Sequence, residues 1–300
     1  MGKLTYKVNF MLIIEIRRCN PNGTPEEGKN GEPRLIFDDT YGLISYECLK
    51  RLIRDEFEYQ EKDSIYLKKR KDSPEMTTKD RFYAEDDIKK AIECKDYKLI
   101  RDLACKKWRD VRTFGLTFTE ESDDDKKKGS EEELRSESFE ITGPVGITDA
   151  ISVYPVDVVY VERASSVNKK EKGLKPERGS IGGGHSFIKH GLYTAWGDIN
   201  IRDAARTGFS DDDLNVLIEA LKHLFTEKGA ANKIGGTRVL RKLIIWKQNA
   251  ETYSVNPEDL FDSVQISLKE GIEKPESFRD YDIVIEDMGV DTEVFPKPRS

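Results

Sequence analysis

Residues 8–16 form an almost unbroken apolar run, Val-Asn-Phe-Met-Leu-Ile-Ile-Glu-Ile, near the start of this 300-residue chain. A strand with one face in water alternates apolar and polar residues, whereas a continuous run is typical of a strand covered on both faces. The sequence Asn20-Pro21-Asn22-Gly23 then ends the strand, because proline lacks a ladder donor and Asn-Gly favours positive φ. A suitable fold must therefore cover both sides of this first strand.

A helix is predicted shortly after this turn. Leu49, Leu52, Ile53 and Phe57 follow the spacing of one apolar helical stripe, and Ser45 is a suitable N-cap. The stripe should dock on the sheet, so the basic residues of the helix should face away from the core, near the asparagine turn. These are Lys50, Arg51 and Arg54. Guanidinium and amide groups are suitable hydrogen-bond donors for phosphate oxygens, so this region is a candidate phosphate-binding surface. The alternative interpretation is that the basic side of the helix is solvated and binds no ligand.

The order of the remaining elements predicts an α+β fold: a ferredoxin-like or RNA-recognition-motif core with large helical and loop insertions. Two helices are predicted over 86–107, meeting near Lys95-Asp96, and another follows the capping box at 210–213. Strands are predicted over 112–118, 139–161, 192–201, 239–246, 264–268 and 281–285, with a helical turn at 257–261. We treat 1–300 as a single domain with a helical insert (56–110), an acidic flexible loop (119–138), a basic loop (163–191) and an acidic tail (270–300).

The charge of the chain is segregated along the sequence. The net charge of −7 argues at first against a nucleic-acid partner, but residues 228–247 contain six basic residues and no acid. Residues 165–191 carry six lysines and arginines against two glutamates, while acids gather at 120–137 and 270–293. Such segregation allows one surface to bind phosphates while another repels them.

Several classes of site find little support in the sequence. The four cysteines, Cys19, Cys48, Cys94 and Cys105, show no CxxC pairing, so neither a zinc site nor a disulfide framework is expected. The stretch 179–186 resembles a phosphate-binding loop but has His185 in place of its lysine, so no nucleotide cofactor is expected. No signal peptide or membrane-spanning run is found, so we expect a cytoplasmic protein without a membrane partner.

The three histidines, His185, His190 and His223, have no identifiable catalytic partners in the sequence. A ribonuclease needs a general acid or base near neutral pKa, and His185 and His190 lie within the basic segment. A non-catalytic protein is the main expectation, and an endoribonuclease using His185 or His190 is the alternative. Tyr193 and Trp196 could stack on bases, although core packing is the commoner role of a strand aromatic.

Short motifs recur in one order along the chain. They are Asn20-Pro21-Asn22-Gly23, Gly42-Leu43-Ile44, Cys48-Leu49-Lys50-Arg51 with Arg54, Asp110-Val111-Arg112-Thr113-Phe114-Gly115, Ile141-Thr142-Gly143-Pro144-Val145, Gly191-Leu192-Tyr193, and Thr207-Gly208-Phe209-Ser210 with Asp213-Leu214. This ordered set, over roughly residues 5–270, resembles the backbone subunit of type I CRISPR interference (Cascade) complexes, a CRISPR RNA-binding member of the RAMP superfamily. The likeness is closest to subtype I-C and next to subtype I-B.

The resemblance implies a non-catalytic subunit without a cofactor that binds CRISPR RNA and holds it for pairing with target DNA. Its other partners would be further copies of itself, arranged head-to-tail in a helical filament, and the other Cascade subunits. The basic segment 169–189 would be an extended thumb and its return path. An RNA-binding module unrelated to defence is the remaining alternative.

The candidate RNA-binding residues are expected to gather on one sheet face together with the basic side of the first helix. They are Arg17, Arg18, Asn20, Asn22, Lys50, Arg51, Arg54, Arg112, Arg163, Lys169, Lys170, Lys189, His190, Arg238 and Arg241.

Overall fold

The computed structural model describes residues 3–22, 32–68, 78–119, 138–164, 181–225, 235–249 and 254–297. Its strands are β1 (Tyr6–Cys19), β2 (Leu35–Ile36), β3 (Tyr41–Ile44), β4 (Gly115–Thr119), β5 (Ser138–Thr142), β6 (Val145–Ile147), β7 (Ala150–Ser152), β8 (Val158–Ala164), β9 (Ile181–Ile199), β10 (Thr237–Asn249), β11 (Val264–Leu268), β12 (Tyr281–Ile285) and β13 (Asp291–Phe295). Its helices are α1 (Tyr46–Gln60), α2 (Thr78–Tyr83), α3 (Asp86–Glu93), α4 (Tyr97–Lys107), α5 (Arg109–Phe114), α6 (Ile201–Thr207), α7 (Asp211–Lys222), α8 (Pro257–Asp262) and the 3₁₀ turn η2 (Phe278–Asp280).

The main sheet has the strand order β13-β10-β1-β9-β7-β3-β2, and β6 and β8 also pair with β9. β9 is antiparallel both to β1 and to the successive strands β6, β7 and β8. β1 therefore runs parallel to β6–β8 with β9 between them, and α1 lies in the connection, which is a split βαβ unit. With β10 antiparallel on the other side of β1, this confirms the predicted ferredoxin-like α+β core.

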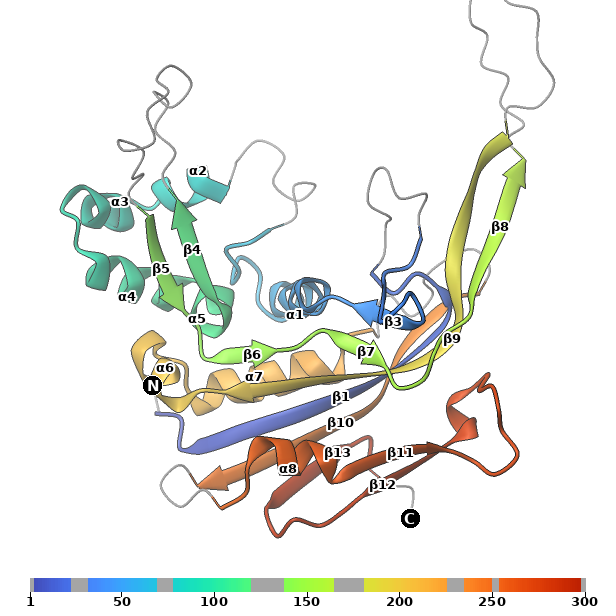
Figure 1. Ribbon diagram of the computed structural model, residues 1–300. Helices are drawn as coiled ribbons and strands as arrows, with labels where there is room; N and C mark the ends of the chain where they lie inside the picture. Colours follow the sequence, from blue (N-terminus) through green and yellow to red (C-terminus); the bar gives the residue numbers. More distant parts are fainter. Residues whose placement is uncertain are drawn as a thin grey trace, which may run out of the picture.

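Both faces of β1 are covered, as its apolar run predicts. Leu12, Ile14 and Ile16 lie in one core with residues of α1 and α7. Met11 and Ile13 lie in a second core on the other face, beneath α8, β11 and β12. Figure 1 shows the two helices on one side of the sheet and the C-terminal layer on the other.

The helical insert carries its own core between α2–α5 and the β4–β5 pair. Its largest buried side chains, Tyr66, Phe82 and Trp108, have ring centroids 4.9–5.5 Å apart. The predicted helix pair over 86–107 is confirmed as α3 and α4. The strand predicted over 112–118 begins only at Gly115, because residues 109–114 form α5. None of the helices in the described ranges is long and apolar enough to cross a membrane.

β8 and the first half of β9 form a hairpin that leaves the main sheet. Val158 pairs with Ile188, and the pairing continues to Ala164 opposite Ile181. β9 is thus much longer than the predicted strand over 192–201, and the hairpin arms replace part of the predicted basic loop. Lys169 and Lys170 lie outside the described residues, as does most of the predicted acidic loop 119–138.

Two strands, β12 and β13, lie within the stretch 270–300 that was predicted as an acidic tail. β12 pairs with β11, which confirms both predicted strands, and β13 pairs with β10 at the edge of the main sheet. These strands are held in place by a shared core, in which Ile283, Ile285 and Val294 pack against the buried face of the sheet.

Gly42 in β3 occupies a position without room for a side chain. A Cβ atom there would lie 2.0 Å from the Tyr193 hydroxyl and 2.7 Å from its Cζ. Tyr193 is fully buried, so core packing, and not base stacking, is its role.

We therefore expect Gly42→Ala to lower the free energy of unfolding by about 1–3 kcal/mol, because overpacking forces the buried ring to shift. Urea unfolding of Gly42→Ala, Tyr193→Leu and the double variant would measure this. The cost of Gly42→Ala should shrink when Tyr193 is already Leu, and an equal cost in both backgrounds would contradict the clash.

Candidate nucleic-acid interface

The asparagine turn fastens the end of β1 to the start of α1. Asn22 Nδ2 donates to the Leu43 carbonyl (2.8 Å), and Asn22 Oδ1 accepts from the Ser45 amide (2.9 Å). Asn20 Oδ1 accepts from the Asn22 amide (3.2 Å), while its Nδ2 donates to the Glu32 carbonyl (3.2 Å). The oxygen and nitrogen of both side chains thus bond within the protein, so the structure does not support the predicted contacts of Asn20 and Asn22 with RNA.

The first amides of α1 are also bonded within the protein. The Tyr46 amide donates to Asp149 Oδ1 (2.7 Å), and the Cys48 amide donates to the Ser45 hydroxyl (3.4 Å), which confirms Ser45 as the N-cap. A helix N-terminus attracts anions through free N–H groups. Here Asp149, a residue without any signal in the sequence, already supplies the anion.

The outer side of α1 combines a cation with two aromatic rings. Lys50 Nζ lies 5.3 Å from the ring centroid of Tyr46 and 5.3 Å from that of Phe114. Arg54 Cζ lies 5.1 Å from the same Phe114 ring. Burial is the largest cause that lowers the pKa of Lys50 below its usual value, followed by the charge of Arg54. Within the described ranges no carboxylate forms an ion pair with Lys50.

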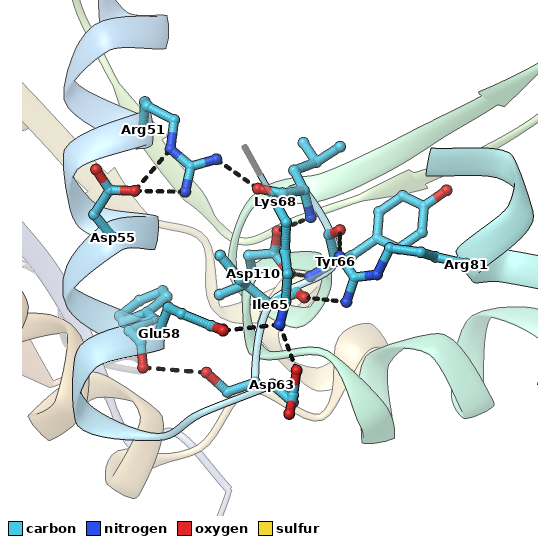
Figure 2. Close-up of polar contacts among 12 residues, drawn as sticks. Arg51, Asp55, Glu58, Asp63, Ile65, Tyr66, Lys68, Arg81 and Asp110 are labelled. Carbon is cyan, nitrogen blue, oxygen red and sulfur yellow. Dashed lines mark hydrogen bonds and ion pairs between the residues drawn. The ribbon is translucent and has the colours of Figure 1, made fainter. Parts of the chain in front are cut away.

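The other two cations of α1, Arg51 and Arg54, hold the segment that follows the helix, and Figure 2 shows the contacts of Arg51. Arg51 donates to Asp55 Oδ1 from Nε (3.0 Å) and Nη2 (2.6 Å), and its Nη1 donates to the Leu67 carbonyl. Arg54 Nε donates to Asp110 Oδ2 (3.1 Å). The prediction that these cations face away from the core is thus wrong for Arg54, whose side chain is 11% exposed and points at the insert.

Asp110 is the centre of this attachment. Its carboxylate is 1% exposed and also accepts from the amides of Tyr66 (2.7 Å) and Leu67 (3.1 Å). Arg81 of α2 donates to the carbonyls of Ile65 (3.0 Å) and Tyr66 from the other side. Residues 65–67 are therefore held both by α1, directly and through Asp110, and by α2.

Arg112 is a structural residue, which corrects its prediction as an RNA contact. Its side chain is 8% exposed and donates to Asp213 from Nε (3.0 Å) and Nη2 (2.7 Å), while Nη1 donates to the Cys105 carbonyl. Asp213 also completes the capping box of α7 with Ser210. The pair therefore joins the insert to the second helix of the core, and the Arg112 side chain is too buried to face a ligand.

The arginines of β10 lie on opposite faces of the sheet, so the predicted single track does not form. Arg238 is opposite Ile16 on the helical face, with Nη1 donating to the Pro21 carbonyl (3.2 Å) and Cζ 5.6 Å from the Phe225 ring. A bulge between Leu240 and Lys242 leaves Arg241 as an extra residue. Arg241 then reaches Glu15 on the other face.

Glu15 binds three groups beneath the C-terminal layer. Oε1 lies 3.2 Å from His190 Nε2 and accepts from the Phe278 amide (2.9 Å), and Oε2 accepts from Arg241 Nε (2.7 Å). Burial opposes ionisation, but the bonds from His190 and Arg241 and their charges outweigh it and lower the pKa of Glu15 to about 2. His190 is buried, so the structure does not support its predicted contact with RNA.

The remaining candidates are more peripheral. Arg17 is half-buried on the face of Glu15, and Arg18 is exposed with a φ of 50°. Lys189 is exposed and pairs with Glu276 (2.7 Å). Arg163 is in register with Gly182 in the hairpin. Within the described ranges, no group of three His, Cys, Asp or Glu residues is arranged to hold a metal ion.

The arrangement that remains is a surface across the start of α1, which we call the α1 surface. It consists of Arg238, Tyr46, Lys50 and Phe114, connected through the Asn20–Asn22 turn. Alternating cations and rings suit a single-stranded nucleic acid, which offers phosphates and base faces in turn. Tyr46 was missed from the sequence, although it is spaced four residues before Lys50. Phe114 comes from the insert and gave no such signal.

Three comparisons place the chain among known proteins. Residues 6–286 match the family model described as CRISPR-associated protein Cas7. A search of curated proteins found no match. A solved structure of a "CRISPR RNA-guided surveillance complex, pre-nicking" is 12% identical, covers 83% of this chain and 80% of its own, and has a TM-score of 0.47. A "CRISPR RNA-guided surveillance complex" is also 12% identical, with coverages of 83% and 72% and a TM-score of 0.43. Both TM-scores are low, so we rest the assignment on the family match.

The Arg112–Asp213 pair should contribute strongly to stability. Replacing Arg112 by Met leaves the buried Asp213 carboxylate with only the more distant guanidinium of Arg109, whose Nε lies 3.9 Å from Oδ1. The free energy of unfolding should therefore fall by about 3 kcal/mol, the lower end for a broken buried pair. Arg206→Met is the matched control, because Arg206 pairs with Asp203 on the surface and is 69% exposed, and it should cost less than about 1 kcal/mol. Denaturant unfolding measures both, and similar costs would refute the structural role of Arg112.

Glu15 should make stability depend on pH. Its pKa is lowered from 4.5 to about 2, so its contribution is complete above about pH 4.5 and is lost as the pH falls toward 2. The stability difference between wild type and Glu15→Gln should therefore narrow from about pH 7 to about pH 3. Glu270→Gln, at an exposed position, serves as control. A difference that stays constant over this range would contradict the assignment.

Proposed function

Because the chain belongs to the CRISPR-associated protein Cas7 family, we propose that it is a CRISPR RNA-binding subunit of the backbone of a type I Cascade interference complex. The family match over residues 6–286 is the observation that carries this proposal. The sequence motifs favour subtype I-C, and subtype I-B next. The subunit holds the guide while target DNA pairs with it, so base pairing supplies the sequence information and the protein needs to recognise shape and phosphates.

The α1 surface is our candidate for the RNA contact. Lys50 and Arg238 supply cations without a carboxylate partner in the described ranges, and Tyr46 is 42% exposed beside Lys50. α1 lies between the helical insert and the β8–β9 hairpin (Figure 1), so a strand crossing it can be held from both sides. The ion pairs of Arg54 and Arg112 fix the insert before RNA binds, which reduces the ordering cost of binding.

The other parts of the proposal concern assembly. Copies of the chain bind one another head-to-tail. When such an interface does not close into a ring, it generates a helical filament. The hairpin of β8 and β9, together with the basic residues that follow β8 in the sequence, serves as the thumb. The subunit itself is non-catalytic. The endoribonuclease alternative loses support at His190, which is 6% exposed and bonded to Glu15.

Lys50→Met should weaken RNA binding on every sequence tested, because an ammonium that contacts phosphate is lost while the aliphatic stem remains. The dependence of log K on log salt should fall by about 0.7 for a single strand. Filter binding of guide-length RNA at several salt concentrations would measure both. Lys269→Met is the control, since Lys269 is an exposed lysine of the C-terminal layer. Unchanged affinity and slope for Lys50→Met would remove α1 from the interface.

The assignment to Cascade is tested separately by purification from the native host. Small RNA and further CRISPR-associated subunits should co-purify with the chain. A chain that purifies free of both would overturn the proposed function.

A further inference from the structure

The hairpin of β2 and β3 leads directly into α1 and has one face turned away from the core. Ile36 pairs with Tyr41, and the next residue, Gly42, faces the core, because a Cβ atom there would meet Tyr193. Successive residues of a strand point to opposite faces, so Tyr41 and Ile36 point outward. We call this outward side, from Arg34 to Tyr41, the β2–β3 face.

A cation lies at the end of the β2–β3 face that is nearer to α1. Arg34 is exposed, and its carbonyl accepts from the Leu43 amide (2.9 Å). Burial raises the pKa of the Glu47 carboxyl, but hydrogen bonds at the start of α1 and the charge of Arg34 lower it below its usual value. Arg34 therefore lies close to the start of α1, where Tyr46 belongs to the α1 surface.

The turn between β2 and β3 holds an exposed ring on a strained backbone. Phe37, Asp38 and Asp39 have φ angles of 53°, 54° and 56°, a left-handed run that is sterically unfavourable for residues with a Cβ atom. Thr40 fastens the turn on both sides: its Oγ1 donates to the Phe37 carbonyl (2.7 Å), and its carbonyl accepts from the Val156 amide (2.8 Å). Strain that the surrounding structure enforces in this way is concentrated at ligand-binding sites.

The Phe37 ring is accessible to a planar ligand. It is 60% exposed, and its centroid lies 5.9 Å from that of Tyr41 in an edge-to-face pair. Single exposed aromatic residues are common on protein surfaces, but this one is presented by an enforced turn and shares the β2–β3 face with Arg34. Asp38 and Asp39 are exposed beside it and would repel a phosphate, so the tip suits a base and not the backbone of a nucleic acid.

We propose that the β2–β3 face extends the α1 surface, with Phe37 stacked on one nucleobase of the bound single strand and Arg34 on a neighbouring phosphate. Single-strand binding sites combine cations along the backbone with rings against the bases, and Lys50, Arg34 and Phe37 supply these groups. The inference rests on the proposed RNA binding and adds a base contact to it. Every base has a π face, so the contact requires no particular base.

A guide-length RNA and the same RNA built entirely from stable abasic nucleotides test the stacking, because the second keeps the phosphates and offers no bases. Filter binding gives the affinity of each variant for both. Phe37→Ser should bind normal RNA about tenfold more weakly than wild type and should bind abasic RNA equally well. Phe37→Trp keeps a ring and should restore the affinity. If removal of the bases weakens binding equally in wild type and Phe37→Ser, the proposal is wrong.

Two further variants locate the effect on the β2–β3 face. Arg34→Met should weaken both RNAs alike and lower the dependence of log K on log salt by about 0.7. Tyr59→Ser removes a ring that is 76% exposed in the last turn of α1 and should leave both affinities unchanged. A loss for Tyr59→Ser as large as that for Phe37→Ser would overturn the assignment to Phe37.

The outcomes separate this inference from the proposed function. A wild-type chain that binds neither RNA would overturn both, whereas unchanged binding of normal RNA by Phe37→Ser would overturn the stacking alone. Sedimentation without RNA tests the other occupant that an exposed ring can have, a second copy of the chain. If Phe37→Ser reduces self-association there and leaves RNA affinity unchanged, the ring belongs to a protein interface and the proposal is overturned.

Discussion

The burial of β1 on both faces is the constraint on which the rest of the architecture depends. A strand with no solvent-exposed face needs a covering layer on each side. In this chain α1 and α7 cover one side, and α8 with β11–β12 covers the other. The one carboxylate in this apolar run, Glu15, is tolerated because Arg241, His190 and the Phe278 amide satisfy it. Glu15 thus also attaches the C-terminal layer to the sheet through the Phe278 amide.

The same chemistry fixes the insert to the core, and it changes how the basic residues are interpreted. Asp110 and Asp213 are buried carboxylates, and each needs a guanidinium partner, Arg54 and Arg112 respectively. A count of lysines and arginines therefore overestimates the cations available to RNA. The net charge of the chain, in contrast, underestimates its capacity to bind RNA. The exposed acids of the C-terminal layer lie on the face opposite α1 and do not oppose binding at the α1 surface.

Local patterns were sufficient to predict the core and insufficient to predict its side-chain partners. The two-sided strand, the stripe of α1 and the capping box of α7 depend on neighbours in sequence, and each was predicted correctly. Residues 112–114 belong to α5 where a strand was expected, and the partners of Asp110 and Arg112 in this helix, 44 and 101 residues away, have no local signature in the sequence. The bulge that turns Arg241 away from Arg238 likewise has no local signature. Of the α1 surface, Lys50 and Arg238 were found from the sequence, but the rings of Tyr46 and Phe114 were not.

Most motif residues that identify the family connect one structural element to another and are not placed to contact RNA. Asn22 caps the entry to α1, and Ser210 with Asp213 begins α7 while holding the insert through Arg112. Such residues are constrained by each other, so their presence indicates a preserved architecture whether or not they touch a ligand. Among the motif cations in the described ranges, Lys50 has no carboxylate partner of its own and rests on two rings instead. A cation that the fold does not use for itself is the one that remains for phosphate, which is why the proposed contact centres on Lys50.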